Sequence, residues 1–159
     1  MADPTTNQLR VRLVTPERTL FDHAADTVEL PSKSGYMEML YGHAPLLAEL
    51  GAGDVTIHRN GGGAGAGAGE AAAKETGGAE GELRYNVSWG FVEVLPDRVT
   101  ILASDALKPE EIDVKRAEEQ RVRGEKMWTQ AGESEEAYSE ALRVIAEADA
   151  KIASAAERR

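Results

Sequence analysis

The chain has 159 residues, of which 42% are apolar and 5% aromatic, so it is long enough for one domain, with or without an appendage, around a mostly aliphatic core. Its 28 acidic and 18 basic residues give a net charge of −10, which argues against a nucleic-acid partner because phosphate binding needs a basic face. The charge suits either a basic protein surface or simple solubility. Cysteine is absent, which excludes disulfides and thiolate metal sites, and neither a signal peptide nor a membrane-spanning segment is expected.

The first half of the chain has the period-two alternation of apolar and polar residues that is typical of half-buried strands. The alternation is clearest at 8–14 and 54–59. Further short strands are predicted at 18–21, 25–30, 37–41, 44–50, 83–87, 90–94 and 98–102. About eight to ten short strands with frequent turns are typical of a sandwich or barrel.

Residues 60–82 interrupt the strands with a run of glycine and alanine. These residues bury almost no apolar surface and cannot offset the entropy lost on ordering, so we predict a long mobile loop between two paired strands. Glu70 and Lys74 lie four residues apart, a spacing that supports one marginal helical turn.

Helical signals replace the strand signals from Pro109 onward. Proline suits the first turn of a helix, and the two glutamates after it complement the positive end of the helix dipole. We predict a first helix from Pro109 to about Arg123, with Gly124 as a break or weak point. A turn at 131–133 then separates it from a final helix capped by Ser134.

The final helix carries two rows of apolar residues at a spacing of seven. One row is large and the other small: Tyr138, Ile145 and Ile152, and Ala141, Ala148 and Ala155. With Leu142 they form a seam that favours an antiparallel two-helix hairpin over one continuous helix, because the intervening turn is short. We therefore expect a β-sandwich domain over 1–106 and a helical hairpin domain over 107–159. The hairpin, with fewer large buried residues, should be the less stable unit.

The sequence contains no recognisable catalytic or metal-binding set. His23, His43 and His58 are far apart, and none has a second histidine at the helical spacing of a zinc site. Ser88 lacks the preceding glycine of a nucleophile elbow. The chain alone is therefore not expected to be an enzyme, and we assign it no catalytic residue and no metal ligand.

Three segments occur in an order and at a spacing that are specific when taken together: Gly-His-Ala-Pro-Leu-Leu at 42–47, Ser-Trp-Gly-Phe-Val-Glu-Val at 88–94, and Glu-Glu-Ile-Asp-Val-Lys-Arg-Ala at 110–117. In this ordered set the chain resembles the epsilon subunit of the F-type ATP synthase. The resemblance implies a ten-stranded flattened β-barrel or sandwich followed by a C-terminal antiparallel two-helix hairpin. It also implies a non-catalytic rotor subunit of the central stalk, which couples c-ring rotation to ATP synthesis and inhibits ATP hydrolysis through its C-terminal helices.

The same resemblance implies the gamma subunit and the c-ring as partners, and the alpha/beta hexamer as a further partner of the helices. The positions of the gamma contact are occupied by Tyr41, Gly42 and His43. The positions of the c-ring contact are occupied by Ser34, Tyr36 and Glu38. From its neighbours alone, His43 is either hydrogen-bonded to its own turn or a contact residue on an exposed rim. The implied location is peripheral, on the cytoplasmic side of the bacterial inner membrane.

Some members of this family bind ATP through an Ile-Asp-x-x-Arg motif, which Ile112, Asp113 and Arg116 match. The resemblance thus implies ATP as a regulatory ligand, and no other cofactor is expected. The residues alone favour a helix-start carboxylate with an Asp–Arg pair. The chain departs from the family pattern at Glu38, Tyr41 and Trp89, and it has Leu107 where ATP-binding members carry an acid.

Two other functions remain open. One is a free-standing adaptor, in which a β-sandwich binding module forms homodimers through a helical tail. The other is a nucleotide-sensing regulator, which is compatible with a rotor subunit.

Overall fold

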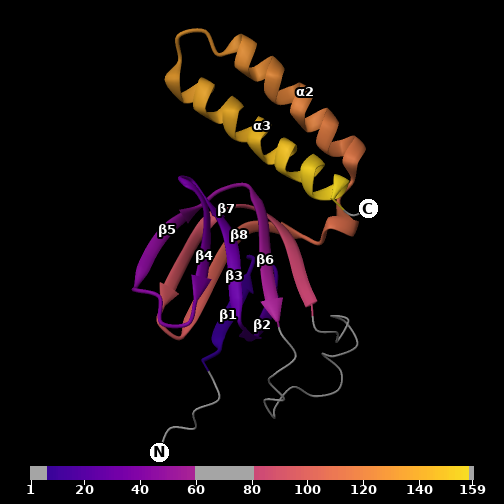
Figure 1. Cartoon of the computed structure of the whole chain (residues 1–159). Helices are drawn as coiled ribbons and strands as arrows, with labels where there is room; N and C mark the ends of the chain where they lie inside the picture. The colour runs from indigo at the N-terminus through magenta and orange to yellow at the C-terminus, as the bar shows by residue number, and fades with distance from the viewer. Residues whose placement is uncertain (1–6, 60–80, 158–159) are drawn as a thin grey trace, which may run out of the picture.

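A computed structural model describes residues 7–59 and 81–157, in which strands come first and helices follow (Figure 1). The strands are β1 (Leu9–Val14), β2 (Thr19–Ala25), β3 (Thr27–Ser32), β4 (Gly35–Leu40), β5 (Leu46–Leu50), β6 (Gly53–Arg59), β7 (Gly81–Leu95) and β8 (Arg98–Leu107). A short 3₁₀ turn η1 (Pro109–Glu111) precedes the helices α2 (Val114–Gln130) and α3 (Glu135–Ala156). The predicted β-sandwich with a C-terminal helical hairpin is confirmed.

The strands pair in the order β2-β1-β8-β7-β5-β3-β4, and β6 joins β3 to β7. The β1–β8 pair is parallel and the other pairs are antiparallel. Strand β7 belongs to both layers of the sandwich, because Gly81–Val87 pairs with β6 and Gly90–Val94 pairs with β5. Two strands predicted on either side of Trp89 are thus one bent strand, and β8 extends to Leu107. The described residues therefore form eight strands rather than the ten that the resemblance implies, and one of them, β7, was predicted as two.

The bend in β7 lies at Trp89 and Gly90, which have φ values of 43° and 135°. A Cβ atom on Gly90 would lie 1.9 Å from the carbonyl oxygen of Leu102, so only glycine fits at this position. The strand therefore crosses from one layer to the other where its backbone packs tightly on β8.

The predicted Gly/Ala loop at 60–82 falls mostly outside the described residues. Its two ends are paired as expected, since Arg59 of β6 lies opposite Gly81 of β7. Residues 81 and 82 belong to β7, however, because the β6 ladder continues through them.

The core is built from the inward-facing residues of both layers. Strand β1 shows the pattern clearly, since Leu9, Val11 and Leu13 are fully buried while the residues between them are exposed. Met39, Leu50, Ile57, Tyr85, Val92 and Ile101 extend the same cluster. Each such side chain contributes about 1.5–3 kcal/mol through burial.

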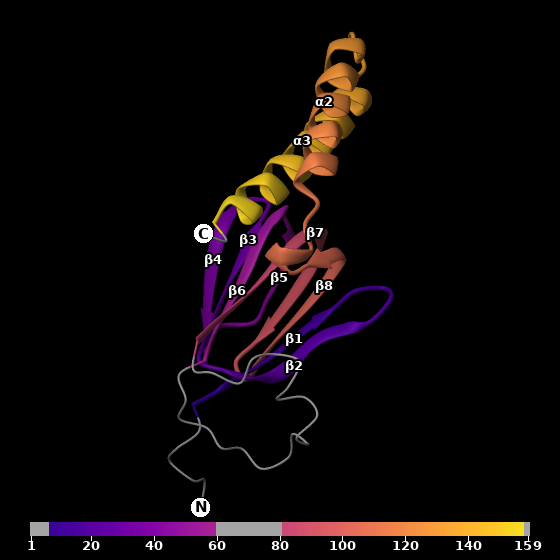
Figure 2. The same ribbon diagram turned by 90° about the vertical axis from the view of Figure 1, so that its right-hand side faces the viewer.

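The helices lie beyond one end of the sandwich, with α3 between the strands and α2 (Figures 1 and 2). The first helix begins later than predicted, because Asp113 has an extended backbone and caps α2 by accepting a hydrogen bond from the Arg116 N–H at 3.1 Å. The residues from Pro109 to Glu111 form a separate turn instead.

Gly124 does not break the first helix, contrary to the prediction. It lies within α2 and is buried, and a Cβ atom there would meet Ile145 Cγ1 at 2.7 Å. Glycine at this position lets α2 and α3 approach each other closely.

The cap of the second helix and its small-residue row are confirmed. Ser134 accepts a hydrogen bond from the Ala137 N–H at 3.2 Å. Ala141, Ala148 and Ala155 are buried. Of the predicted large seam residues, Tyr138 and Leu142 are exposed, so the hairpin interface consists mainly of small side chains.

Candidate docking surfaces and clefts

The segment predicted to contact partners forms the edge strand β4 and its two flanking turns. Ser34 lies in the β3–β4 turn and Tyr36 lies opposite Pro31, at the end of the sandwich that faces the helices. Tyr41 to His43 follow β4 at the other end, where the Gly42 N–H donates to the carbonyl of Pro96 at 2.6 Å. The structure therefore separates the predicted c-ring and gamma residues by the length of one strand.

Tyr36 is 58% exposed, although its hydroxyl accepts a hydrogen bond from the Asp54 N–H at 3.1 Å. Glu38 is exposed in the middle of β4, opposite Glu29. An exposed ring whose hydroxyl is held in place is well suited to packing against another protein, because little side-chain entropy is lost on binding.

His43 is half-buried and interacts with its own turn. Its Nδ1 lies 2.7 Å from the carbonyl oxygen of Ala44, and its N–H donates to the carbonyl of Leu40 at 3.1 Å. A carbonyl can only accept, so the first contact places a proton on Nδ1. The structure thus contains the local hydrogen bond predicted for His43, which helps to fix the shape of this turn, and a contact of His43 with a partner stays a prediction.

Three apolar side chains project from the outer face of the sheet formed by β5, β7 and β8, and we call them the outer apolar stripe. They are Leu47, Phe91 and Leu102, and they are 72%, 53% and 51% exposed. Phe91 lies directly opposite Leu102, and Leu47 lies opposite Glu93, the next outward-facing residue of β7. The stripe begins at β5, four residues after His43, so it adjoins the predicted gamma segment. Contiguous exposed apolar side chains on a rigid sheet are typical of protein interfaces.

The outer apolar stripe was not predicted, although the sequence contains a signal for it. At Leu46-Leu47, Phe91-Val92 and Ile101-Leu102, two apolar residues are adjacent, so both faces of the strand are apolar. A strand that needs only one buried face does not require the second apolar residue.

Ile112, Asp113 and Arg116 come together at a cleft of about 910 Å³ between the sandwich end and the two helices. Ile112 is buried, and the Asp113 carboxylate accepts the backbone N–H of Arg116 as the helix cap. Six carboxylates and three basic groups line this cleft, so its charge is unfavourable for a polyphosphate.

Helix α3 docks on the sandwich through polar contacts. Arg84 of β7 pairs with Glu157, and Lys151 Nζ lies 3.7 Å from Asp105 Oδ2 of β8. The Asn86 side chain donates to the carbonyl of Ala150 at 3.2 Å. Asn86 Oδ1 and Ser154 Oγ are buried at this contact without a hydrogen-bond partner among the described residues. The contact is therefore weaker than the sandwich core.

Glu147 is half-buried where α3 meets α2 and β7. Burial raises the pKa of its carboxyl, but hydrogen bonds from Lys151, Gln120 and Trp89 outweigh burial and hold the pKa below its ordinary value. The ionised form of Glu147 therefore stabilises the docked position of α3.

Within 7–59 and 81–157, no helix combines the length and apolar character needed to cross a membrane. The same residues contain no cluster of three or more histidine or acidic side chains arranged to hold a metal ion.

The sequence and the fold are similar to those of known proteins. Residues 8–66 match the family described as ATP synthase, Delta/Epsilon chain, beta-sandwich domain. The ATP synthase epsilon chain of Koribacter versatilis (strain Ellin345) is 38% identical over 121 residues, which cover 76% of this chain and 71% of that one. The epsilon chain of Moorella thermoacetica is 37% identical over 118 residues, covering 74% and 75%.

A chain in the mitochondrial ATP synthase of Euglena gracilis, solved as OSCP/F1/c-ring in rotational state 1, has the same fold. The TM-score is 0.70 at 16% identity, and the match covers 95% of this chain and 83% of that one. The agreement in sequence over about three quarters of this chain leads to one conclusion: the chain belongs to the ATP synthase epsilon chain family.

Proposed function

We propose that this chain is a non-catalytic rotor subunit of the central stalk of a proton-translocating ATP synthase, where it couples c-ring rotation to ATP synthesis. The observation that carries the proposal is the outer apolar stripe, an exposed apolar surface on the rigid sandwich of an epsilon-family chain. A rotor part must transmit force through a stiff body, and a closely packed β core provides that stiffness.

The gamma subunit is the partner that we assign to the outer apolar stripe and to the adjoining turn of Tyr41, Gly42 and His43. Burying Leu47, Phe91 and Leu102 would supply the apolar centre of an interface, and Glu49 and Glu93 beside them would supply its polar rim. The acidic chain suits a basic surface on gamma.

We assign the c-ring contact to the other end of β4, at Ser34, Tyr36 and the adjacent Glu38. Tyr36 supplies the exposed ring, and the turn before it projects from the sandwich. With this contact we assign the chain to the cytoplasmic side of a bacterial inner membrane, as a peripheral subunit held by the complex.

The helical hairpin is the regulatory part of the proposal. Because polar contacts hold α3 on the sandwich, the hairpin can leave without disrupting the β core. The released helices would reach the alpha/beta hexamer and restrain ATP hydrolysis. Regulatory ATP at Ile112, Asp113 and Arg116 stays a prediction, and the acidic lining of that cleft disfavours it.

Capture of gamma tests the proposed function. Tagged wild-type chain should retain gamma, and Phe91→Glu should reduce capture about tenfold or more, since a charge at the centre of an apolar interface is costly. Val122→Glu is the matched control, because Val122 is equally exposed but lies on α2, away from the stripe. Equal capture by Phe91→Glu and wild type, or a homodimer that ignores gamma, would contradict the proposal and favour the adaptor.

A further inference from the structure

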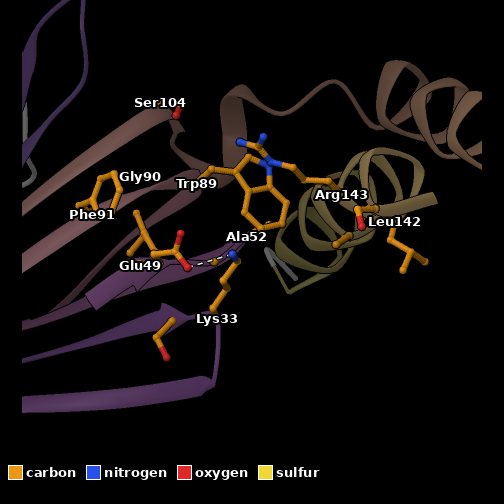
Figure 3. Close-up of a pocket in the computed structure, with 14 residues that line it drawn as sticks. Lys33, Glu49, Ala52, Trp89, Gly90, Phe91, Ser104, Leu142 and Arg143 are labelled. Atoms are coloured by element: carbon orange, nitrogen blue, oxygen red, sulfur yellow. Dashed lines mark ion pairs between the residues drawn. The ribbon is translucent and has the colours of Figure 1, made fainter. Parts of the chain in front are cut away.

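A second cleft, of about 890 Å³, opens between α3 and the sandwich end, and none of its lining residues belongs to the cleft at Ile112 (Figure 3). Lys33, Glu49, Trp89 and Phe91 line it from the sandwich, and Leu142 and Arg143 line it from α3. Its volume falls within the range of small-molecule sites, about 300–1,000 Å³. Figure 3 shows the Arg143 guanidinium over the Trp89 ring, with the Lys33–Glu49 ion pair on the opposite wall.

Trp89 is held firmly as one wall of this cleft. It occupies the left-handed region at φ 43°, where a large side chain is unusual, and Gly90 fixes the bend through its close approach to the backbone of Leu102. Its side chain also lies close enough to Glu147 to help lower the pKa of that carboxyl. Backbone strain of this kind persists where the surroundings fix it, and it is concentrated at binding sites.

Arg143 brings a positive charge to the cleft that the sandwich does not neutralise. Its guanidinium lies 4.8 Å from the centre of the Trp89 ring. Among residues 7–59 and 81–157 no carboxylate forms an ion pair with it. The guanidinium therefore has N–H donors available for an anion while one of its faces rests on the indole.

The Trp89 cleft and the cleft at Ile112 have opposite charge. Lys33 and Arg143 face a single carboxylate, Glu49, in the Trp89 cleft. The cleft at Ile112 has six carboxylates against three basic groups. In a chain of net charge −10, a local excess of positive charge beside aromatic side chains favours an anionic ligand at this cleft over the rest of the surface.

We propose that the Trp89 cleft binds a small organic anion that carries a phosphate or carboxylate group on a flat apolar ring. The ring packs against the exposed part of Trp89 and Arg143 binds the anionic group, while Lys33 adds positive charge on the opposite wall. Such a ligand touches both α3 and the sandwich, so its binding stabilises the docked hairpin. Phe91 belongs both to this cleft and to the outer apolar stripe, but the tests of the two proposals change different residues.

Fluorescence of Trp89 tests this site directly. The chain has two tryptophans, and Trp128→Phe leaves Trp89 as the sole reporter while keeping an aromatic ring beside Tyr138. Phenyl phosphate should give a saturable change. Benzylamine has a similar ring with the opposite charge, and inorganic phosphate has the charge without the ring, so both should bind at least about tenfold more weakly.

Arg143→Gln in the same background should weaken phenyl phosphate binding about tenfold, since a charge-assisted hydrogen bond is lost. Arg123→Gln is the matched control, because Arg123 lies in the acidic cleft, and it should change binding by less than about twofold. Circular dichroism checks that both variants are folded. Equal weakening by the two variants, no saturable signal, or equal binding of the three probes would overturn the proposal. Gamma capture by the wild type is unaffected by any of these outcomes.

Discussion

The β-sandwich and the helical hairpin are held together by different interactions. In the sandwich, large aliphatic side chains from both layers are fully buried, as with Leu13, Leu30 and Ile101. The hairpin packs through an alanine row and Gly124, and it docks on the sandwich through ion pairs and hydrogen bonds. Burial of large apolar groups is worth much more than exposed ion pairs. The difference suits a stiff body with a tail that can be released.

The largest expected effect is in the sandwich core. Ile101→Ala should lower the free energy of unfolding by about 2–5 kcal/mol, because it removes a fully buried side chain and leaves a cavity. Leu102→Ala, at the adjacent but exposed position, should change it by less than about 0.5 kcal/mol. Urea denaturation measures both. Similar losses in the two variants would show that the core is not where the stability lies.

The hairpin should respond to Gly124→Val with a smaller loss, about 1–3 kcal/mol, because the new side chain overlaps Ile145 on α3. Hydrogen exchange should show this loss in α2 and α3 and leave β7 and β8 protected. Glu125→Ala, at the next and exposed position, is the control. Faster exchange in β7 and β8 with Gly124→Val would mean that the two parts unfold together.

Features that depend on neighbours along the chain could be predicted from the sequence, and features that depend on contacts between distant segments could not. Alternation at Leu9, Val11 and Leu13 predicts a half-buried strand, and Ser134 predicts a helix start, since both depend on neighbours along the chain. The role of Gly124 depends on Ile145, which lies in another helix, and the sequence alone gives no indication of that contact. The continuity of β7 through Trp89 and Gly90 was missed for the same reason.

The candidate surfaces also differ in how far the sequence alone predicts them. The segment from Ser34 to His43 was identified from a resemblance, and the structure places its two ends at opposite ends of one strand. The outer apolar stripe could be predicted only by knowing that Phe91 and Leu102 are cross-strand neighbours. The charge of each cleft could not be predicted either, because side chains from both the sandwich and the hairpin line each cleft.

Acidification should loosen the hairpin more than the sandwich. The folded pKa of Glu147 lies below its ordinary value of 4.5, so its contribution is complete above that value and is lost as pH falls further. Trp89 fluorescence in the Trp128→Phe background should therefore change below about pH 4.5 before β-sheet circular dichroism does. Glu147→Gln should lose this early change. An identical pH profile in the variant would assign the effect to another carboxylate.

The smallest expected effect comes from the exposed end of the docking contact. Arg84→Gln removes the ion pairs with Asp54, Glu82 and Glu157 and should lower hairpin stability by no more than about 1 kcal/mol. High salt should produce a change of the same sign in the wild type. A loss comparable to that of Ile101→Ala would show that the docking contact is a major source of stability.

Native-state hydrogen exchange of the full chain tests the central distinction most directly. The account predicts that amides of α2 and α3 exchange through openings of lower free energy than those of β7 and β8, so that the helices lose protection while the sheet retains it. Equal opening free energies in the helices and the strands would contradict the account, because the hairpin could not then leave the sandwich without unfolding it.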